Sequence, residues 1–502
     1  MSPENNSYQK KDGKKWLFLC AAVVLVYIAL HIYLCSCHEA WRDEAQAWGI
    51  AGSSTLTEIF GRLGADGHPC LWFLVIAPLA KLGFPFGWLG YFTTGLMAVS
   101  VWLWLVYAPL PKWVRLITLT GSIFLYYNSV IARIYALTVL IVLIIAIFFR
   151  RRTEKPFFYS VLVALLFQSH ILFAGLGMGL LCEYFLRRKD VPTEKKTGFL
   201  CGGVLQFLSM VAFFLEMRQI KGASIPVSFS SVIANLLYPD RLRESAGFIG
   251  RFLWGTGNIW ISYFLILSVI LCFLLLSVLT SRSLGRKAGF RFFVIAFLSL
   301  GVDLGIFLTV RQPEHTQMVI CMTMVMLFLI WIYFDEFAAG QNKLLLNLVL
   351  VFFVCFTTVG TWQPTFPAIR YDISRPFSNS REMGEYISAQ LPENSVILVG
   401  KPQCNLAPAF YGSDNRDDIR FICYYSDEPL KYMYWEQEYP EWSPEEIADY
   451  AETQYPDTPD LYLLEDHTVE HPSFAPEYSA EKENLWKENN YLYRYIPSGK
   501  DR

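Results

Sequence analysis

Long apolar runs, separated by short polar segments, recur through the first 362 residues of the chain. Backbone in a lipid bilayer must satisfy its own hydrogen bonds, so runs of this length predict transmembrane helices. The chain is therefore expected to be mainly α and to cross a membrane many times. The runs lie at 16–34, 71–84, 88–107, 114–128, 133–149, 157–186, 199–215, 258–280, 290–310, 318–334 and 344–362.

One run, 157–186, is too long for a single span and carries Gln168, Ser169 and His170 near its middle. Polar residues are costly at membrane depth unless they meet partners. This pattern predicts two short helices that meet at a polar corner.

Basic residues cluster in several loops, and basic loops of membrane proteins lie in the cytoplasm. With the N-terminus inside, the C-terminal part lies outside the cell membrane, so the number of spans is odd, 11 or 13. Lys112 and Arg115 place loop 108–113 inside, so either 71–84 or 88–107 does not fully cross. The loops expected inside are 10–15, 150–155, 187–196, 282–291 and the loop ending at Lys343; those expected outside are 36–70, 168–171, 216–257, 311–317 and 363–502.

The composition changes abruptly after Trp362. Residues 363–502 carry 26 acidic and 12 basic residues, whereas the first 362 carry 18 acidic and 30 basic. We therefore expect a transmembrane domain, 1–362, followed by a small acidic external α/β domain, 363–502. Its expected helices are 380–390 and 444–453, the latter capped by Ser443 with Glu446 completing a capping box, and its expected strands are 395–399, 419–424, 461–464 and 491–495.

Composition supports the membrane assignment, because 54% of residues are hydrophobic and only 17% are charged, against about a quarter charged in soluble domains. The basic residues are scattered over short loops, which argues against a nucleic-acid partner. No Cys pattern indicates structural zinc. Cys404 and Cys423 could pair or remain buried thiols.

The first external loop, 36–70, contains two acidic clusters beside the membrane. Asp43 and Glu44 directly follow the first helix, and Asp66-Gly-His68-Pro precedes the next apolar run. A carboxylate there could accept a proton from a hydroxyl nucleophile as a general base. The alternative is a solvated loop with a helix-capping Asp and an Asp-Gly turn.

The segment Trp-Arg-Asp-Glu-Ala at 41–45, followed some twenty residues later by Asp-Gly-His-Pro at 66–69, resembles the protein O-mannosyltransferase family (glycosyltransferase family 39). Bacterial relatives of that family include the aminoarabinose transferases of lipid A, and all belong to the glycosyltransferase C superfamily. This chain has Cys70 after Pro69 where many relatives carry a second proline. The resemblance covers the helical region loosely and implies a superfamily, not a substrate.

The resemblance implies that Asp43 is the catalytic base, with Glu44 beside it. Glu44 and Asp66 would shape the acceptor site, and His68 would orient the acceptor or a bound ion. Asp66 and His68 could also ligate a divalent cation. An inverting transfer needs only one carboxylate, because polyprenyl phosphate is already a good leaving group, unlike the hydrolases with paired carboxylates.

The leaving phosphate requires cations. Arg311 opens an external loop and suits bidentate phosphate binding, and Arg133, Tyr135, His170 and His315 are expected on the same face. An Arg at a helix end can simply extend to the interface, and a lone His in an apolar run often only packs. Ionisable groups at membrane depth nevertheless tend to mark function.

The sequence thus predicts an inverting glycosyltransferase that moves a sugar from a polyprenyl-phosphate-linked donor to a hydroxyl of a protein, lipid or wall glycan. Loop 216–257 could be a lid or a plain connector, and the external domain is expected to help choose the acceptor. The alternatives are a polytopic transporter or lipid flippase, or a non-catalytic scaffold. The absence of an evident internal repeat, and acids placed in a loop and not at the midplane, argue against transport.

Overall fold

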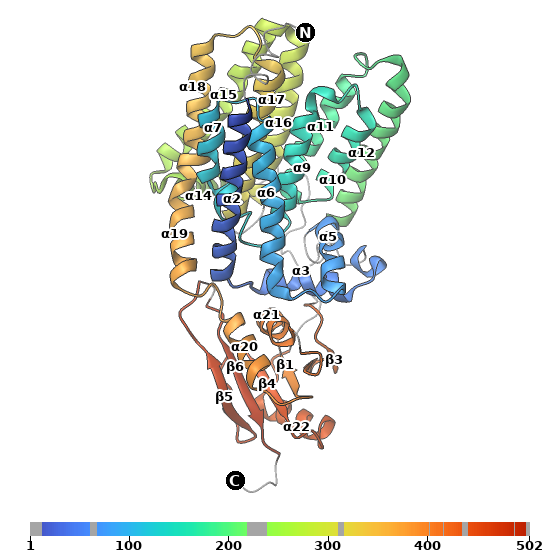
Figure 1. Ribbon diagram of the computed structural model, residues 1–502, viewed down its shortest axis with the longest axis vertical. Coiled ribbons are helices and arrows are strands. Elements are labelled where there is room, and N and C mark those ends of the chain that lie inside the picture. Colours follow the sequence, from blue (N-terminus) through green and yellow to red (C-terminus); the bar gives the residue numbers. More distant parts are fainter. Residues whose placement is uncertain are drawn as a thin grey trace.

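A computed structural model describes residues 13–60, 68–217, 238–309, 316–400, 402–414, 416–433, 440–485 and 487–497. It contains a long helical bundle with a small α/β domain packed against one of its ends (Figure 1). The chain is mainly helical, as predicted, and the sheet is confined to the C-terminal part.

Seven helical segments of the described chain are long and apolar enough to cross a membrane, which is consistent with an integral membrane protein. The total of 11 or 13 spans and the side on which each terminus lies stay predictions. The segments are α2 (Lys14–Cys37), η1 with α6 (Phe86–Tyr107), η5 with α12 (Thr193–Met217), α15 (Ile259–Leu284), α16 (Arg286–Thr309), α17 with η6 (Thr316–Phe337), and α18, η7 and α19 together (Lys343–Ser374).

The remaining apolar segments form shorter helices. α5 (Leu71–Lys81) has 11 residues and rises about 17 Å, roughly half the thickness of the hydrocarbon core. Of the two segments in doubt, 71–84 is therefore the one too short to cross. Run 114–128 is broken into α7 (Lys112–Ile117), η2 (Thr118–Thr120) and α8 (Ser122–Leu125), and run 133–149 gives α9 (Tyr135–Phe148) and η3 (Phe149–Arg151).

The predicted polar corner within 157–186 is confirmed. α10 (Pro156–Phe167) ends at the corner, and η4 (Ile171–Phe173) and α11 (Ala174–Leu186) follow it. Gln168 Nε2 donates to the backbone oxygen of Ser209 at 3.0 Å, and the Ser169 hydroxyl donates to the oxygen of Leu166 at 2.7 Å. The corner is tolerated because its polar groups are hydrogen-bonded within the protein.

Ion pairs connect three of the predicted basic loops with each other or with the ends of neighbouring helices. Arg152 pairs with Glu183 at 2.8 Å and with Glu336 at 2.7 Å, and Arg291 pairs with Asp190 at 2.8 Å. These contacts gather the loops at the end of the bundle that lies away from the α/β domain (Figure 1).

The C-terminal domain is built on a six-stranded sheet in the order β3-β2-β1-β4-β6-β5. β1 is parallel to β2 and β4, and the other pairings are antiparallel. The strands are β1 (Val396–Val399), β2 (Arg420–Cys423), β3 (Glu428–Pro429), β4 (Leu461–Glu465), β5 (Phe474–Ala480) and β6 (Asn490–Tyr495); the helices are α20 (Ser380–Gln390), α21 (Pro402–Ser413) and α22 (Pro444–Gln454).

All the predicted elements of this domain are present, and Ser443 caps α22 in a capping box with Glu446. α21, β3 and β5 were not predicted. The domain boundary expected at 363 falls inside α19 (Gly360–Ser374), which stays helical through Pro364 and Pro367. Cys423 is a free buried thiol, whereas the side chain of Cys404 lies outside the described residues.

The first loop contains α3 (Arg42–Ser53), which lies between the bundle and the C-terminal domain (Figure 1). Gln46 of α3 exchanges two hydrogen bonds with the backbone of Met433, at 2.8 and 2.9 Å. The Tyr411 hydroxyl of α21 accepts from the N–H of Ala40 at 2.9 Å. These contacts fix α3 and the residues just before it against the C-terminal domain.

Candidate functional site

Asp43 stands in the first turn of α3, where the partial positive charge of a helix N-terminus favours a carboxylate. Its side chain is 28% exposed and forms an ion pair with Nη1 of Arg133. Arg133 belongs to the segment between α8 and α9. The pair therefore joins the first loop to a separate part of the bundle. The sequence analysis predicted that these two residues lie on the same face.

The second guanidinium nitrogen of Arg133 contacts His68. Nη2 lies 2.7 Å from Nε2 of the imidazole, so Nε2 accepts this hydrogen bond and the ring proton resides on Nδ1. Burial lowers the pKa of Arg133, but Asp43, Tyr135 and Glu44 together outweigh burial and raise the pKa, so the guanidinium stays charged. A nitrogen that faces a guanidinium is poorly placed to bind a metal ion.

His170 and Tyr135 complete the cluster. The His170 ring centroid lies 5.0 Å from that of His68 and 4.9 Å from that of Tyr135. Nδ1 of His170 accepts from the backbone N–H of Leu172 at 3.1 Å, which fixes the ring at the start of η4. Asp43, His68, Arg133, Tyr135 and His170, all predicted from the sequence, are thus brought together from four segments.

Glu44, the other acid of the motif, is fully buried. Its Oε1 accepts from the N–H of Ala132 at 2.6 Å, and Oε2 accepts from the N–H of Trp41 at 3.1 Å. His38 Nε2 lies 3.5 Å from Oε2. These contacts engage both oxygens with the protein itself, which favours a structural role over the expected catalytic one.

His38 forms a second buried centre that the sequence analysis did not assign. Its Nδ1 lies 3.0 Å from Oδ2 of Asp372 in α19, and the Tyr126 hydroxyl donates to the same oxygen at 2.8 Å. Burial lowers the pKa of His38, but Asp372 and Glu44 outweigh this and raise it to about 10. The imidazolium therefore binds α2, α3 and α19 together next to the site.

Glu488 of the C-terminal domain was also missed. It lies between β5 and β6, is 5% exposed, and has Oε1 3.7 Å from Nε of Arg42. Burial raises its pKa to about 7, the charge of Arg42 opposes this rise, and Asp43 adds to it. No motif in the sequence distinguishes this acid from the many others nearby.

Three predicted site residues, Asp66, Arg311 and His315, lie outside the described residues, so their roles stay predictions. In the loop 216–257, the described part forms α14 (Pro239–Trp254), and residues 218–237 are likewise outside.

An apolar cavity of about 240 Å³ lies between α14, α15, α16 and α17, lined by residues such as Leu253, Phe273, Leu300 and Met326. α14 also reaches the segment that carries Arg133, because the ring of Phe252 lies 6.4 Å from that of Tyr127. The apolar lining of the cavity suits a hydrocarbon ligand.

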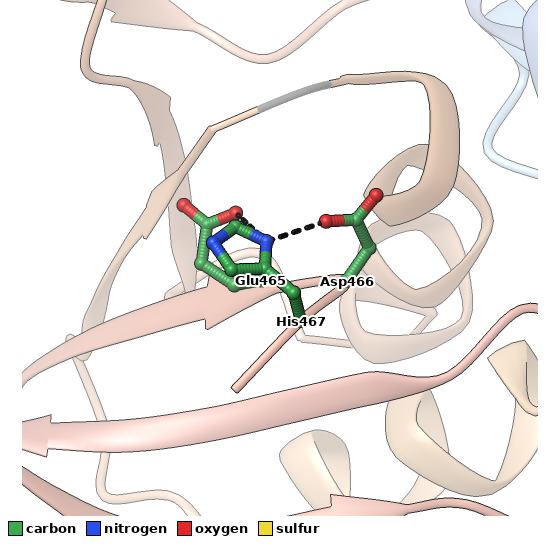
Figure 2. A group of neighbouring side chains, drawn as sticks. All are labelled: Glu465, Asp466 and His467. Atoms are coloured by element: carbon green, nitrogen blue, oxygen red, sulfur yellow. Dashed lines mark hydrogen bonds and ion pairs between the residues drawn. The ribbon is translucent and has the colours of Figure 1, made fainter. Parts of the chain in front are cut away.

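A group of possible metal ligands lies elsewhere, at the end of β4 in the C-terminal domain (Figure 2). His467 Nδ1 lies 2.8 Å from Asp466 Oδ1 and 3.8 Å from Glu465 Oε2. The three residues are consecutive, and the His467 side chain is 63% exposed. This arrangement has the donor atoms to hold an ion, but it does not include His68, which was predicted as a possible ligand.

The arrangement around Asp43 offers a partly exposed proton acceptor next to a charged guanidinium fork, two imidazoles and a phenol. Such a set can bind an anionic group and deprotonate a neighbouring hydroxyl. Comparison with family models and with curated proteins gives no match for this chain. The resemblance to the glycosyltransferase C superfamily thus rests on the loop motif alone.

Proposed function

We propose that this chain is an inverting glycosyltransferase that moves a sugar from a polyprenyl-phosphate donor to a hydroxyl acceptor at the membrane surface. The observation that carries the proposal is the pairing of Asp43 with Arg133, with His68 on the other arm of the guanidinium. The proposed base and the proposed anion-binding group thereby lie next to each other.

In the proposed reaction, Asp43 takes the proton of the acceptor hydroxyl as its oxygen attacks the anomeric carbon. The bond from that carbon to the phosphate oxygen breaks, and its electron pair leaves with the polyprenyl phosphate. Arg133 stabilises the charge on the departing phosphate by a bidentate contact. Because Arg133 also pairs with Asp43, an incoming phosphate competes for the guanidinium and frees the base.

The apolar cavity between α14 and α17 supports this proposal, because a polyprenyl chain needs apolar surroundings. His170 and Tyr135 would border the phosphate, and both are fixed by the contacts described above.

The direct test is mass spectrometry of lipids that co-purify with the protein in detergent. We expect a polyprenyl phosphate or its glycosylated form, and transfer activity that is lost in Asp43→Asn with membrane insertion intact. Asp240→Asn, an exposed acid of α14, is the matched control. Transfer that survives Asp43→Asn would overturn the proposal, and a scaffold would tolerate the change.

A transporter is the second candidate, and one observation favours it. Asp303 of α16 is 1% exposed, and neither of its carboxyl oxygens has a hydrogen-bond partner among the described residues. A buried acid within a membrane helix is typical of ion coupling. Flux of a lipid or ion into proteoliposomes that depends on Asp303 but not on Asp43 would favour transport over transfer.

A further inference from the structure

Glu488 is a buried carboxylate that the protein leaves without donors. Within the described part of the chain, no group donates a hydrogen bond to Oε1 or Oε2. Its backbone is fixed, because its N–H donates to Asn484 Oδ1 at 2.9 Å and its carbonyl accepts from Asn484 Nδ2 at 3.0 Å. The side chain is thus held in place on a rigid turn before β6.

Arg42 links this carboxylate to the proposed base. Its Nε lies 3.7 Å from Glu488 Oε1 and 3.9 Å from Asp43 Oδ1. Both distances exceed the length of a hydrogen bond. Arg42 therefore offsets the charge of the two acids without donating a hydrogen bond from Nε to Glu488. Glu488 is therefore the point at which the C-terminal domain reaches the Asp43 site.

A buried carboxylate without donors costs free energy, and a ligand that donates hydrogen bonds to both oxygens would remove this cost. A carboxylate accepts two hydrogen bonds side by side, which matches two neighbouring hydroxyl groups of a sugar ring. The required ligand is thus a polyhydroxyl compound that binds next to Asp43.

We propose that Glu488 is a sugar-binding residue, contributed by the C-terminal domain, which accepts hydrogen bonds from a pair of adjacent sugar hydroxyls beside Asp43. This inference rests on the proposed glycosyl transfer and deepens it, because it assigns the C-terminal domain a direct part in sugar recognition. The sugar belongs either to the donor or to a glycan acceptor, which share this chemistry.

The test uses the full-length protein in detergent, with free hexoses and their deoxy analogues as probes in saturation-transfer NMR. We expect Glu488→Gln and Glu488→Met to weaken hexose binding at least tenfold. The wild type should bind hexoses more tightly than their deoxy analogues, whereas the variants should bind both with the same affinity. Glu481→Gln, at an exposed acid that also lies between β5 and β6, is the matched control and should bind hexoses normally. Unchanged hexose binding in both Glu488 variants, or no hexose binding by the wild type, would overturn the inference.

Stability provides an independent readout. An apolar side chain removes the buried charge, so Glu488→Met should unfold at a higher temperature than the wild type while binding hexose more weakly. A lower unfolding temperature in Glu488→Met would instead mark a structural residue and overturn the inference.

Undecaprenyl phosphate binding, followed by native mass spectrometry, separates this inference from the proposed function. Wild type and Glu488 variants should bind that lipid equally. Loss of hexose binding in the Glu488 variants, with lipid binding retained, supports the inference. A wild type that binds hexose but not the lipid contradicts the polyprenyl-phosphate donor of the proposed function and leaves the role of Glu488 intact. In a transfer assay, a raised KM for only the donor or only the acceptor identifies which sugar Glu488 contacts.

Discussion

The carboxylate of Asp43 is ion-paired with the guanidinium of Arg133, although 90 positions separate the two residues in the chain. The same guanidinium reaches His68. Both arms of Arg133 are thus engaged, and an anionic ligand that binds it must displace a protein partner. The state of the proposed base is thereby coupled to occupancy of the anion site.

Arg133→Lys tests this coupling, because it keeps the charge but removes the planar fork. Loss of one charge-assisted hydrogen bond, about 1.5–3 kcal/mol, predicts roughly a ten- to hundredfold weaker affinity for undecaprenyl phosphate. A titration followed by native mass spectrometry measures it, with Arg251→Lys on the exposed side of α14 as the control. Equal affinities for both variants would contradict the role given to Arg133.

Glu44 and Asp43 are neighbours in sequence but should respond differently to substitution. Glu44→Ala leaves the N–H of Ala132 without its acceptor and removes a buried partner of His38, which predicts a loss of about 3 kcal/mol in the free energy of unfolding. Asp43→Ala affects a partly exposed pair and should cost less than about 1 kcal/mol. Thermal unfolding in detergent distinguishes them, and the reverse order would refute the structural role of Glu44.

The features that were predicted correctly from the sequence are those that local chemistry determines. Apolar length indicated the helices, and the polar corner at Gln168 within 157–186 followed from a run too long for one span. Ser443 and Glu446 indicated the start of α22 through a capping box. α21 was missed because Pro402, Pro408 and glycines obscure its helical pattern, and β5 because a bulge near Pro476 interrupts its alternation.

The missed site residues depend on contacts that no local pattern carries. His38 meets Asp372 across 334 positions, and Glu488 meets Arg42 only because the C-terminal domain docks on α3. Arg133, Tyr135 and His170 were predicted to share a face with Asp43 because the alternation of basic loops fixes which helix ends lie together. The predicted topology was therefore sufficient to place these residues on one face, but it could not show that Glu44 is buried.

His38 makes stability depend on pH. Its pKa is raised from 6.5 to about 10 in the folded chain, so the stability it contributes is fully present below the unfolded pKa and is lost as the pH rises through the folded pKa. The groups around it are Asp372 on α19, Glu44 on α3, the Tyr126 hydroxyl, and Arg381, which donates to the His38 carbonyl.

We therefore expect the contribution of His38 to make the unfolding temperature fall between about pH 6.5 and about pH 10. Burial also raises the pKa of Glu39 and of Glu488 to about 7. The protein therefore also loses the stability that these two acids contribute as the pH rises from about 4.5 to about 7. His38→Gln should lower the unfolding temperature at pH 6 and flatten the upper part of the profile. A profile with the wild-type slope in His38→Gln would contradict the assignment.

Gly49 makes the docking of α3 on the C-terminal domain possible. A Cβ at this position would lie 2.1 Å from the backbone oxygen of Lys431 and 3.2 Å from the ring of Phe410. Gly49→Ala must separate these elements and should cost about 1–3 kcal/mol. Gly52→Ala, in the same helix, meets only Ala80 at an ordinary 3.4 Å and should be neutral or stabilising by up to about 1 kcal/mol.

Thermal unfolding and hydrogen exchange in α3 and α21 check this pair of glycine variants. Faster exchange in both helices of Gly49→Ala, but not of Gly52→Ala, is expected. Matching exchange in the two variants would show that the backbone at Lys431 moves aside readily, and the docking would then not depend on Gly49.

Arg152 anchors the opposite end of the bundle. Its side chain is 2% exposed and pairs with both Glu183 and Glu336, so Arg152→Met leaves buried negative charge that Arg187 offsets in part. We expect a loss of about 3–5 kcal/mol, whereas Arg151→Met, at an exposed neighbour, should change stability by less than about 0.5 kcal/mol.

The double variant Arg152→Met with Glu183→Leu should recover part of the loss, because it replaces a broken buried pair by apolar packing. Affinity for undecaprenyl phosphate should stay at the wild-type value in any of these variants that folds, since the proposed binding site lies at the other end of the helices. Unfolding temperatures measure the change in stability, and the lipid titration measures the affinity. Equal stability of Arg152→Met and Arg151→Met would mean that the network at this end contributes orientation of the loops but little free energy.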